Sequence, residues 1–188
     1  SRQQLIYVAM GWDIPDMVHI PLIHGPDGAK LSKRHGALGV EKYKEMGYLP
    51  EALNNYLLRL GWSHGDDELI SDAQAIEWFG LDKVGKSPAR FDFDKAKWFN
   101  EQHLRAKTDA ELAKLVQGIA PEKYADVDAE MLEKAVVMMK DRMTFAKDFW
   151  ETALYFFEKP AVYDAKVVRK KWKAERIPLF AILRNRLE

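Results

Sequence analysis

The alternation of apolar and polar residues predicts a chain made mostly of helices. Apolar side chains recur at every third or fourth position in residues 52–60 and again in residues 132–139, a spacing that places them on one face of a helix. Gly11 and Gly47 end two such patterns, because glycine readily terminates a helix. Helices are therefore predicted over residues 3–10, 40–46, 50–60, 71–80, 92–104 and 132–139, and from residues 108, 144 and 164 onward.

Polar residues mark where several of these helices begin. Ser71 and Thr108 are each followed three residues later by Gln or Glu, the capping box in which two side chains satisfy backbone N–H groups reciprocally. Asp92, Thr144 and Asp164 precede other helical patterns and can accept hydrogen bonds from the first free N–H groups. The sequence thus predicts a helix N-terminus at each of these residues.

The character of the chain changes near residue 105. Before this point, a short β-rich run at residues 18–23 predicts a strand, and Pro21 favours the edge of a sheet because proline lacks an N–H donor. After this point, the pattern contains helices only. We predict a mainly α fold with a small β component, divided into residues 1–36, 37–106 and 107–188.

Composition and charge limit the classes of protein and of partner. The chain has 188 residues, enough for one large domain or two small ones. Its 29 Lys and Arg residues equal its 29 Asp and Glu residues, so a polyanion site has to arise from local clustering. The absence of cysteine from the sequence excludes disulfides and thiolate metal sites and fits a reducing compartment. No apolar run reaches membrane-spanning length, so no membrane is expected as a partner.

Residues 25–36 form the most informative local cluster. Glycines flank Lys30, Lys33 and Arg34, and Ser32 lies between the lysines. Glycine permits backbone conformations that are closed to other residues, and lysine is a mobile point charge with three donors. Such a loop can close on a polyphosphate. An exposed basic hairpin is the competing interpretation, and the Lys-x-x-Lys-Arg spacing alone favours it.

Two further clusters of cations are candidates for contacts with nucleic acid. Lys83, Lys86 and Arg90 lie close together around a Ser-Pro pair. Residues 166–176 hold six cations, one anion and an aromatic residue, a combination that can follow phosphates and stack on an unpaired base. A solvated loop and an exposed helix face are the competing interpretations. The candidates in the second cluster are Arg169, Lys170 and Trp172.

In their order along the chain, these segments resemble those of bacterial glutamyl-tRNA synthetases, a family of class I aminoacyl-tRNA synthetases. Lys30–Arg34 (Lys-Leu-Ser-Lys-Arg) resembles the family's form of the class I Lys-Met-Ser-Lys-Ser signature. The match is specific over residues 5–105, and beyond them it rests on helical texture. The matching segments are His19–Ile23 with Gly25–Gly36, Gly47–Leu53 with Asn55–Leu57, Leu60–Ser63 with Gly65–Asp67, Lys86–Ala89 with Phe91–Asp92, and Trp98–Asn100.

The resemblance implies the fold of each region. Residues 1–36 resemble the end of a Rossmann-like catalytic domain with its signature loop, residues 37–106 the stem-contact fold, and residues 107–188 an α-helical anticodon-binding domain. The other class I signature, His-Ile-Gly-His, and the acceptor-stem insertion in which some members hold zinc are not in the sequence. We therefore expect a piece with less than half of the enzyme, truncated in the anticodon-binding region and inactive alone. No zinc site is expected, because His19, His64 and His103 have no metal-ligand spacing among them.

The resemblance also implies an activity, that of a glutamate–tRNA ligase that uses ATP with Mg²⁺. Glutamate attacks the α-phosphorus of ATP to give glutamyl-adenylate and pyrophosphate, and the glutamyl group then moves to the 3′ end of tRNA-Glu. Lys30 and Lys33 are expected to meet the charge that builds on the pyrophosphate. Ser32 and Arg34 are expected to support the loop at the ATP site.

By family position, Leu22 and Ile23 lie against the adenine of ATP, with ordinary strand core as the competing interpretation. Lys83, Lys86 and Arg90 are expected to contact the tRNA backbone. The resemblance implies a cytoplasmic protein, expected to be a monomer, with ATP, L-glutamate and tRNA-Glu as partners.

A catalytically silent RNA-binding or interaction module derived from a synthetase is the second hypothesis. Two close relatives of the family are disfavoured by the helices predicted after residue 105. Glutaminyl enzymes of the usual type recognise the anticodon with β-barrels, and the shortened tRNA-modifying paralogue lacks an anticodon-binding region.

Overall fold

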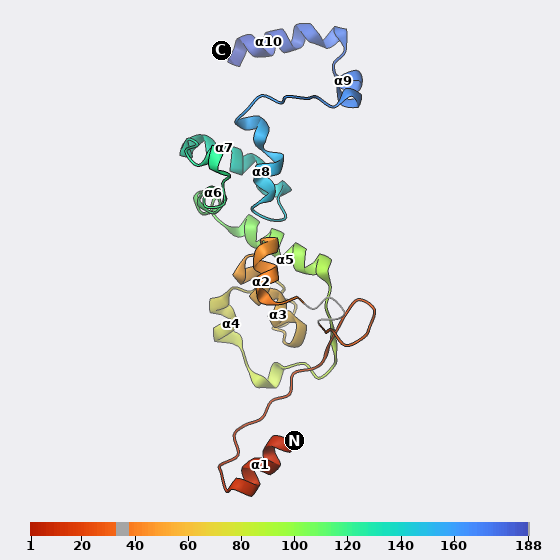
Figure 1. Ribbon diagram of the computed structural model, residues 1–188, viewed down its shortest axis with the longest axis vertical. Coiled ribbons are helices and arrows are strands. Elements are labelled where there is room, and N and C mark those ends of the chain that lie inside the picture. The colour runs from red at the N-terminus through yellow and green to blue at the C-terminus, as the bar shows by residue number, and fades with distance from the viewer. Residues whose placement is uncertain (33–37, 188) are drawn as a thin grey trace.

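The computed structural model describes residues 1–32 and 38–187 and shows helices arranged along an elongated molecule (Figure 1). The mainly α fold with a small β component is confirmed. The α-helices and strands are α1 (Arg2–Met10), β1 (Ile23–His24), α2 (Val40–Met46), α3 (Pro50–Gly61), α4 (Asp72–Trp78), β2 (Ala89–Arg90), α5 (Phe93–Ala106), α6 (Asp109–Gln117), α7 (Ala129–Met139), α8 (Asp148–Thr152), α9 (Ala165–Lys171) and α10 (Ile177–Leu187). Short 3₁₀ turns include η2 (Leu81–Lys83), η3 (Glu122–Tyr124), η4 (Lys140–Arg142), η5 (Leu154–Phe156) and η6 (Ala174–Arg176).

Capping side chains set the starts of several helices as the sequence predicted. The Ser71 hydroxyl accepts a hydrogen bond from Gln74 N at 3.3 Å, and the Gln74 side chain accepts one from Ser71 N at 3.0 Å. Thr108 and Glu111 make the same reciprocal pair at the start of α6. Asp92 caps α5 with its carboxylate. These contacts satisfy backbone donors that the start of a helix leaves free.

The helix predicted from residue 144 is wrong in its start and its length. Only the short helix α8 forms, and its N-cap residue, Lys147, makes no capping hydrogen bond through its side chain. Asp148 Oδ2 accepts hydrogen bonds from Thr144 N at 3.2 Å and from Phe145 N at 2.8 Å. The Thr144 hydroxyl instead donates to Glu101 at 2.7 Å. A tertiary contact with α5 therefore replaces the local cap that the sequence pattern predicted.

The strand predicted over residues 18–23 is wrong for most of its length, because only Ile23 lies in β1. Pro21 has no N–H group to donate. Pairing begins at Leu22, whose carbonyl accepts a hydrogen bond from Ala89 N at 3.1 Å. β1 and β2 then pair in parallel, with Ile23 opposite Ala89. Residues 12–21 thus approach the sheet without regular structure.

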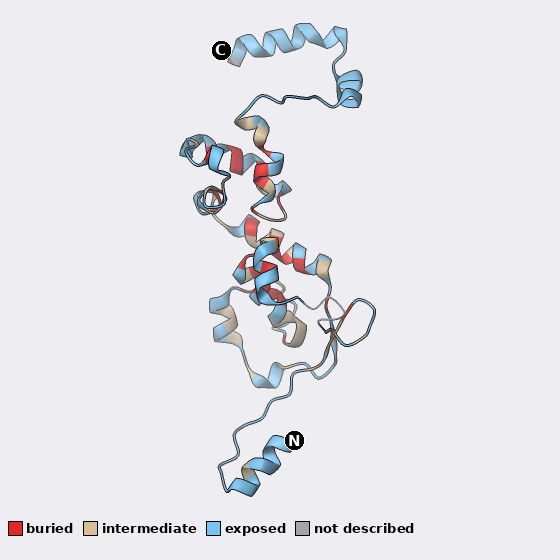
Figure 2. Ribbon diagram, in the orientation of Figure 1, coloured by how far each residue is buried: buried red, intermediate tan, exposed pale blue. Residues whose placement is uncertain are grey.

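Two apolar cores lie along the molecule, and α5 contributes to both (Figure 2). The aromatic core consists of Tyr43, Tyr48, Leu53, Tyr56, Phe91, Ala96 and Phe99. The helical core consists of Leu49, Ala52, Leu104, Leu112, Ala113, Val116, Tyr124, Leu132, Ala135, Val136, Met139, Met143, Ala146, Phe149, Trp150 and Ala153. Because Leu49, Ala52 and Leu104 pack with residues of α6, α7 and α8, the helical core crosses residue 106.

The two ends of the chain lie outside these cores. Neither α1 nor α9 contains a buried residue, and Figure 2 shows both ends of the molecule as exposed. Within residues 1–32 and 38–187, no helix combines the length and the apolar composition that crossing a membrane requires.

Candidate functional site

A tight hairpin carries the first lysine of the cationic loop. Gly25 N donates to Ala29 O at 2.8 Å, and Leu31 N donates to Ile23 O at 2.8 Å. At the tip, Gly28 has a φ of 78°, a left-handed conformation that glycine adopts without steric cost. The hairpin therefore closes over residues 25–29 and delivers Lys30 on its returning arm.

The base of this hairpin is held on both sides. β1 pairs in parallel with β2, and Phe91 N donates to His24 O at 2.8 Å. On the other side, His24 forms an antiparallel bridge with Lys30. Phe91 is 3% exposed and anchors the end of β2 in the aromatic core. The hairpin is thus held by the paired strands β1 and β2, which we call the platform, and is not a free loop.

Tyr56 connects this platform to α3. Its hydroxyl donates to Asp92 O at 2.9 Å and accepts from Asp92 N at 2.7 Å. Burial raises the pKa of Tyr56 to about 12, so the phenol stays protonated at neutral pH and can make both bonds. The sequence pattern predicts Tyr56 on the apolar face of a helix and does not indicate the two hydrogen bonds of its hydroxyl.

Replacing Tyr56 by phenylalanine is expected to lower the free energy of unfolding by about 2 kcal/mol, because both backbone groups of Asp92 lose their partner. Urea denaturation followed by circular dichroism measures the loss. Tyr163→Phe is the matched control, since the Tyr163 side chain is exposed. Equal stability of both variants would show that water replaces the Tyr56 hydroxyl.

Lys30 is the predicted catalytic residue that the structure places most clearly. Its side chain is exposed beside the hairpin, while Leu31 packs against the aromatic core. Among the described residues, Lys30 has no acidic partner. Ser32 is half-buried. Lys33 and Arg34 lie outside the described residues, so their predicted roles at the ATP site stay predictions.

Arg90 lies at the hairpin. A Cβ added to Gly28 would be 3.5 Å from Arg90 Nη2, so the guanidinium lies against the turn. Arg90 also lines a hollow of about 380 Å³ together with Pro26 and Phe93. In the sequence, Arg90 is grouped with Lys83 and Lys86 on its own connection. The fold brings it instead to the turn that leads to Lys30, because β1 and β2 are neighbours.

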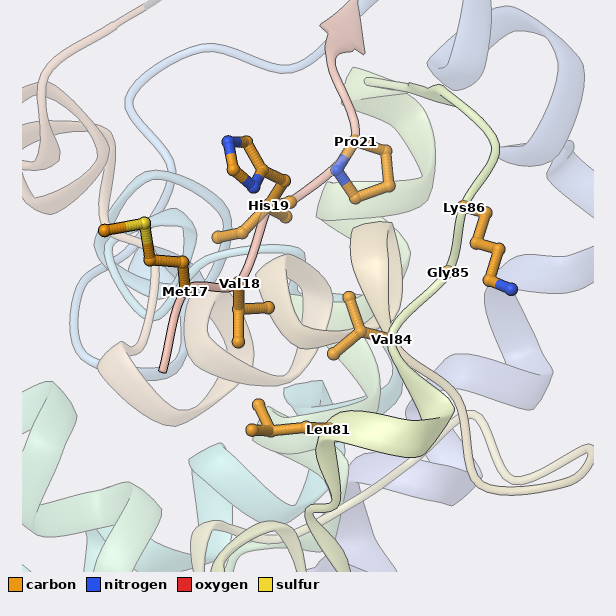
Figure 3. A pocket seen from close by; sticks show the side chains of 9 residues that line it. Met17, Val18, His19, Pro21, Leu81, Val84, Gly85 and Lys86 are labelled. Carbon is orange, nitrogen blue, oxygen red and sulfur yellow. The ribbon is translucent and has the colours of Figure 1, made fainter. Parts of the chain in front are cut away.

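Lys83 and Lys86 lie on the connection before β2. Lys83 Nζ is 6.0 Å from the centroid of the Trp62 ring, a distance at which a cation is attracted to an aromatic face. Lys86 lines a hollow of about 460 Å³ in which residues 17–21 lie opposite Leu81, Val84 and Gly85 (Figure 3). Both lysines are exposed and remain accessible to a phosphate backbone.

The two apolar residues predicted to meet adenine differ in their surroundings. Leu22 is 52% exposed. Ile23 packs against the aromatic core and also lines an apolar cleft of about 470 Å³ with Trp62 and Phe79. The core interpretation therefore fits Ile23 better than it fits Leu22, and contact with adenine stays a prediction.

The cationic residues near the C-terminus form a second, distant group. Arg169 and Lys170 are exposed on α9, at the far end of the molecule from α1 (Figure 1). Trp172 stacks on Phe180 with ring centroids 4.8 Å apart and an interplanar angle of 9°. One face of the indole is therefore covered by the chain itself. The predicted tRNA contacts thus occupy two separate places.

Two buried amides were not among the residues predicted from the sequence. Asn55 is 2% exposed and Asn100 is 0% exposed. Both lie on otherwise apolar helix faces, in α3 and in α5. A buried polar group requires hydrogen-bond partners, so an Asn on an apolar face was the signal in the sequence that could have indicated these contacts. Burial also lowers the pKa of His103, whose Nε2 lies 3.0 Å from Asn55 Oδ1.

The part of the chain that the structure describes contains no cluster of His, Asp and Glu that could hold a metal ion.

Comparison with known proteins places this geometry in a family. The model for the catalytic domain of class I tRNA synthetases (E and Q) matches residues 1–98, and that for an anticodon-binding domain matches residues 96–188. The chain therefore belongs to the class I tRNA synthetases of the E and Q group. The resemblance seen in the sequence is confirmed.

The similar proteins are glutamate–tRNA ligases. Glutamate–tRNA ligase 2 of Parvibaculum lavamentivorans is 47% identical over 100% of this chain and 39% of its own length. Glutamate–tRNA ligase 2 of Rickettsia typhi is 47% identical over 100% of this chain and 41% of its own length. The crystal structure of a glutamate tRNA ligase from Elizabethkingia meningosepticum, in complex with its amino acid, gives a TM-score of 0.83 at 37% identity over 95% of this chain. The chain thus spans about two fifths of the length of these relatives.

Proposed function

We propose that this chain is the part of a glutamate–tRNA ligase that carries a loop to ATP and holds the tRNA. The observation that carries the proposal is the exposed Lys30, delivered by a fixed hairpin in a chain whose relatives are glutamate–tRNA ligases. The partners are ATP with Mg²⁺, L-glutamate and tRNA-Glu. Cytoplasmic location and a monomeric state stay predictions from the sequence.

The proposed chemistry has two steps. A carboxylate oxygen of glutamate attacks the α-phosphorus of ATP, the bond to the β-phosphate breaks, and pyrophosphate leaves with the bonding electrons. A hydroxyl of the terminal ribose of tRNA then attacks the glutamyl carbonyl, and AMP leaves. Lys30 and Lys33 lower the first barrier by placing ammonium groups where negative charge develops. Mg²⁺ enters bound to the ATP phosphates, so no metal site on these residues is needed.

The surroundings of the hairpin suggest roles for its neighbours. Leu22 offers an exposed apolar surface to the adenine, whereas Ile23 is engaged with the core. Arg90 lies against the Gly28 turn, where a guanidinium can pair with a phosphate of the nucleotide or of the acceptor end of the tRNA. Ser32 and Arg34 support the loop around the ATP phosphates.

Two separate cationic groups support a long ligand such as tRNA. Lys83 and Lys86 lie near the platform that carries the hairpin, and Arg169, Lys170 and Trp172 lie on the far terminal segment (Figure 1). A single nucleotide cannot reach both groups, but a folded RNA can follow the length of the molecule. Phosphate contacts of this kind position the RNA without reading its sequence.

The proposal is tested in a ligase of the relatives' full length that carries this sequence. We expect ATP-dependent attachment of radioactive glutamate to a tRNA-Glu transcript, with a turnover of about 1 per second or faster. A reaction without ATP and a reaction with a non-cognate tRNA are the controls. Binding of tRNA without any charging would contradict the proposal and favour the silent RNA-binding module.

A further inference from the structure

A buried amide in α5 joins three segments that are distant in the sequence. Asn100 Oδ1 accepts a hydrogen bond from Leu49 N at 2.8 Å. Asn100 Nδ2 donates to Thr144 O at 2.6 Å. These partners lie 51 and 44 residues away along the chain. One side chain therefore ties the start of α3 and the loop before α8 to the middle of α5.

Further contacts surround this amide. We call the three segments together the joint: Gly47–Leu49, Asn100–Glu101 and Thr144–Phe145. The Thr144 hydroxyl donates to Glu101 at 2.7 Å, and the rings of Tyr48 and Phe145 meet edge to face with centroids 5.0 Å apart. Gly47 has a φ of 94°, and a Cβ there would lie 3.5 Å from Phe145 Cβ. The joint is thus closely packed as well as hydrogen-bonded.

The amide contributes direction that apolar packing lacks. Hydrophobic contact is non-directional, so helices α6, α7 and α8, packed on α3 and α5 through apolar side chains alone, could shift against them without breaking a directional bond. A buried donor or acceptor left without a partner costs about 1–3 kcal/mol. Any rotation that separates Asn100 from either backbone partner incurs this penalty. The amide therefore selects one arrangement of the two cores.

Charged pairs near the C-terminal end of α5 constrain the arrangement of the helices less strictly than Asn100 does. Lys107 pairs with Glu51, and Lys140 Nζ lies 2.9 Å from Asp109 Oδ1. All four side chains retain solvent exposure, from 20% to 45%. Ion pairs that water and salt can screen contribute little and tolerate changes in geometry. Asn100, with no exposed surface, is the more demanding constraint.

The joint links the two parts of the proposed function. Ile23 and Leu31 of the hairpin pack against the aromatic core, so the position of Lys30 follows that core. Helices α6, α7 and α8 build the helical core on the other side of the joint. We propose that Asn100 is a positioning residue, which fixes the orientation of the helical core relative to the hairpin so that a bound tRNA presents its end to the ATP loop. This step rests on the function proposed above.

The orientation is measured without any assay of function. The sequence has no cysteine, so Asn54→Cys on α3 and Glu133→Cys on α7, both exposed positions, accept spin labels selectively in the 188-residue chain. Pulsed dipolar spectroscopy is expected to show one narrow distance peak. Asn100→Ala is expected to replace this peak with a broad distribution. Asn100→Asp keeps the shape but turns an oxygen toward Thr144 O, so it broadens the peak even if the alanine variant does not fold.

Asn55→Ala is the matched control, because Asn55 is equally polar and equally buried. Its amide donates to Glu68 O at 3.0 Å and accepts from Ile70 N at 3.1 Å, and its oxygen also lies 3.0 Å from His103 Nε2. None of these partners belongs to the joint. This variant is expected to lose stability as Asn100→Ala does, yet keep the narrow peak. Equal peak widths in all variants, or equal broadening in the control, would overturn the proposal.

The link to function is measured in the full-length ligase. Asn100→Asp is expected to reduce kcat/KM for tRNA about tenfold or more, as small misplacements of reactants do, and to leave KM for ATP unchanged, whereas Asn55→Ala leaves both unchanged. A broadened distance with unchanged tRNA kinetics would overturn the positioning role. If the unsubstituted ligase charged no tRNA, the proposed function would fail, while the distance measurement would still decide whether Asn100 holds the joint.

Discussion

Replacing Lys33 by alanine in a ligase that carries this sequence is expected to slow the formation of glutamyl-adenylate about a hundredfold. An ammonium group that meets the charge on the leaving pyrophosphate contributes about 3 kcal/mol to the stabilisation of the transition state. Lys30→Ala is expected to have an effect of the same order, because both lysines belong to one signature. Single-turnover release of pyrophosphate, with ATP, glutamate and tRNA all saturating, measures the step.

The same variants separate the chemical step from RNA binding. If Lys30 and Lys33 act on the leaving group, the dissociation constant for tRNA changes much less than the rate. Lys42→Ala is the control, since Lys42 is an exposed lysine paired with Glu45 on α2. A loss of tRNA binding as large as the loss of rate would show that the loop docks RNA or supports the fold instead.

Arginine substitution tests whether charge alone is sufficient. Lys30→Arg keeps a positive charge but replaces a compact, mobile ammonium by a planar guanidinium. We expect this variant to recover part of the lost rate, because some electrostatic stabilisation remains. Full recovery would indicate a general electrostatic field, and no recovery would indicate that the small ammonium has to fit a defined position.

The sequence predicted most helices correctly because the hydrogen bonds that start a helix form between residues close together in the chain. The capping boxes at Ser71 and Thr108, and the cap at Asp92, form between residues within three positions of each other, so no tertiary information is needed. Thr144 shows where such reasoning fails. Its hydroxyl meets Glu101, 43 residues away, and a contact of this kind leaves no trace in the local pattern.

The candidate site was predictable in part for the same reason. The residues of the cationic loop follow one another in the sequence, so Lys30 was found from its neighbours. The placement of Arg90 against the Gly28 turn depends on the parallel pairing of β1 with β2. Strands of two residues are too short to leave a recognisable pattern in the sequence. Asn100 belongs to a matching segment, but its bonds to Leu49 and Thr144 depend on how three distant segments pack.

Replacing Phe99 by alanine is expected to lower the free energy of unfolding by about 3–5 kcal/mol, the range for removing a buried aromatic ring. Phe99 is 0% exposed, and its ring centroid lies 5.5 Å from that of Tyr56 and 5.1 Å from that of Trp98. The empty volume would lie in the aromatic core, against which Ile23 and Leu31 of the hairpin pack. Urea denaturation followed by circular dichroism measures the change.

Phe79→Ala provides the control, because Phe79 is 50% exposed and belongs to neither core. Its loss is expected to stay below about 1 kcal/mol, since little buried surface is removed. A small effect of Phe99→Ala would mean that the aromatic core collapses around the vacancy.

A loss near 4 kcal/mol approaches the whole stability of a small domain. Reduced charging by Phe99→Ala would then reflect loss of folded protein, whereas reduced charging by Lys30→Ala, at an exposed side chain, would reflect the chemistry of the loop.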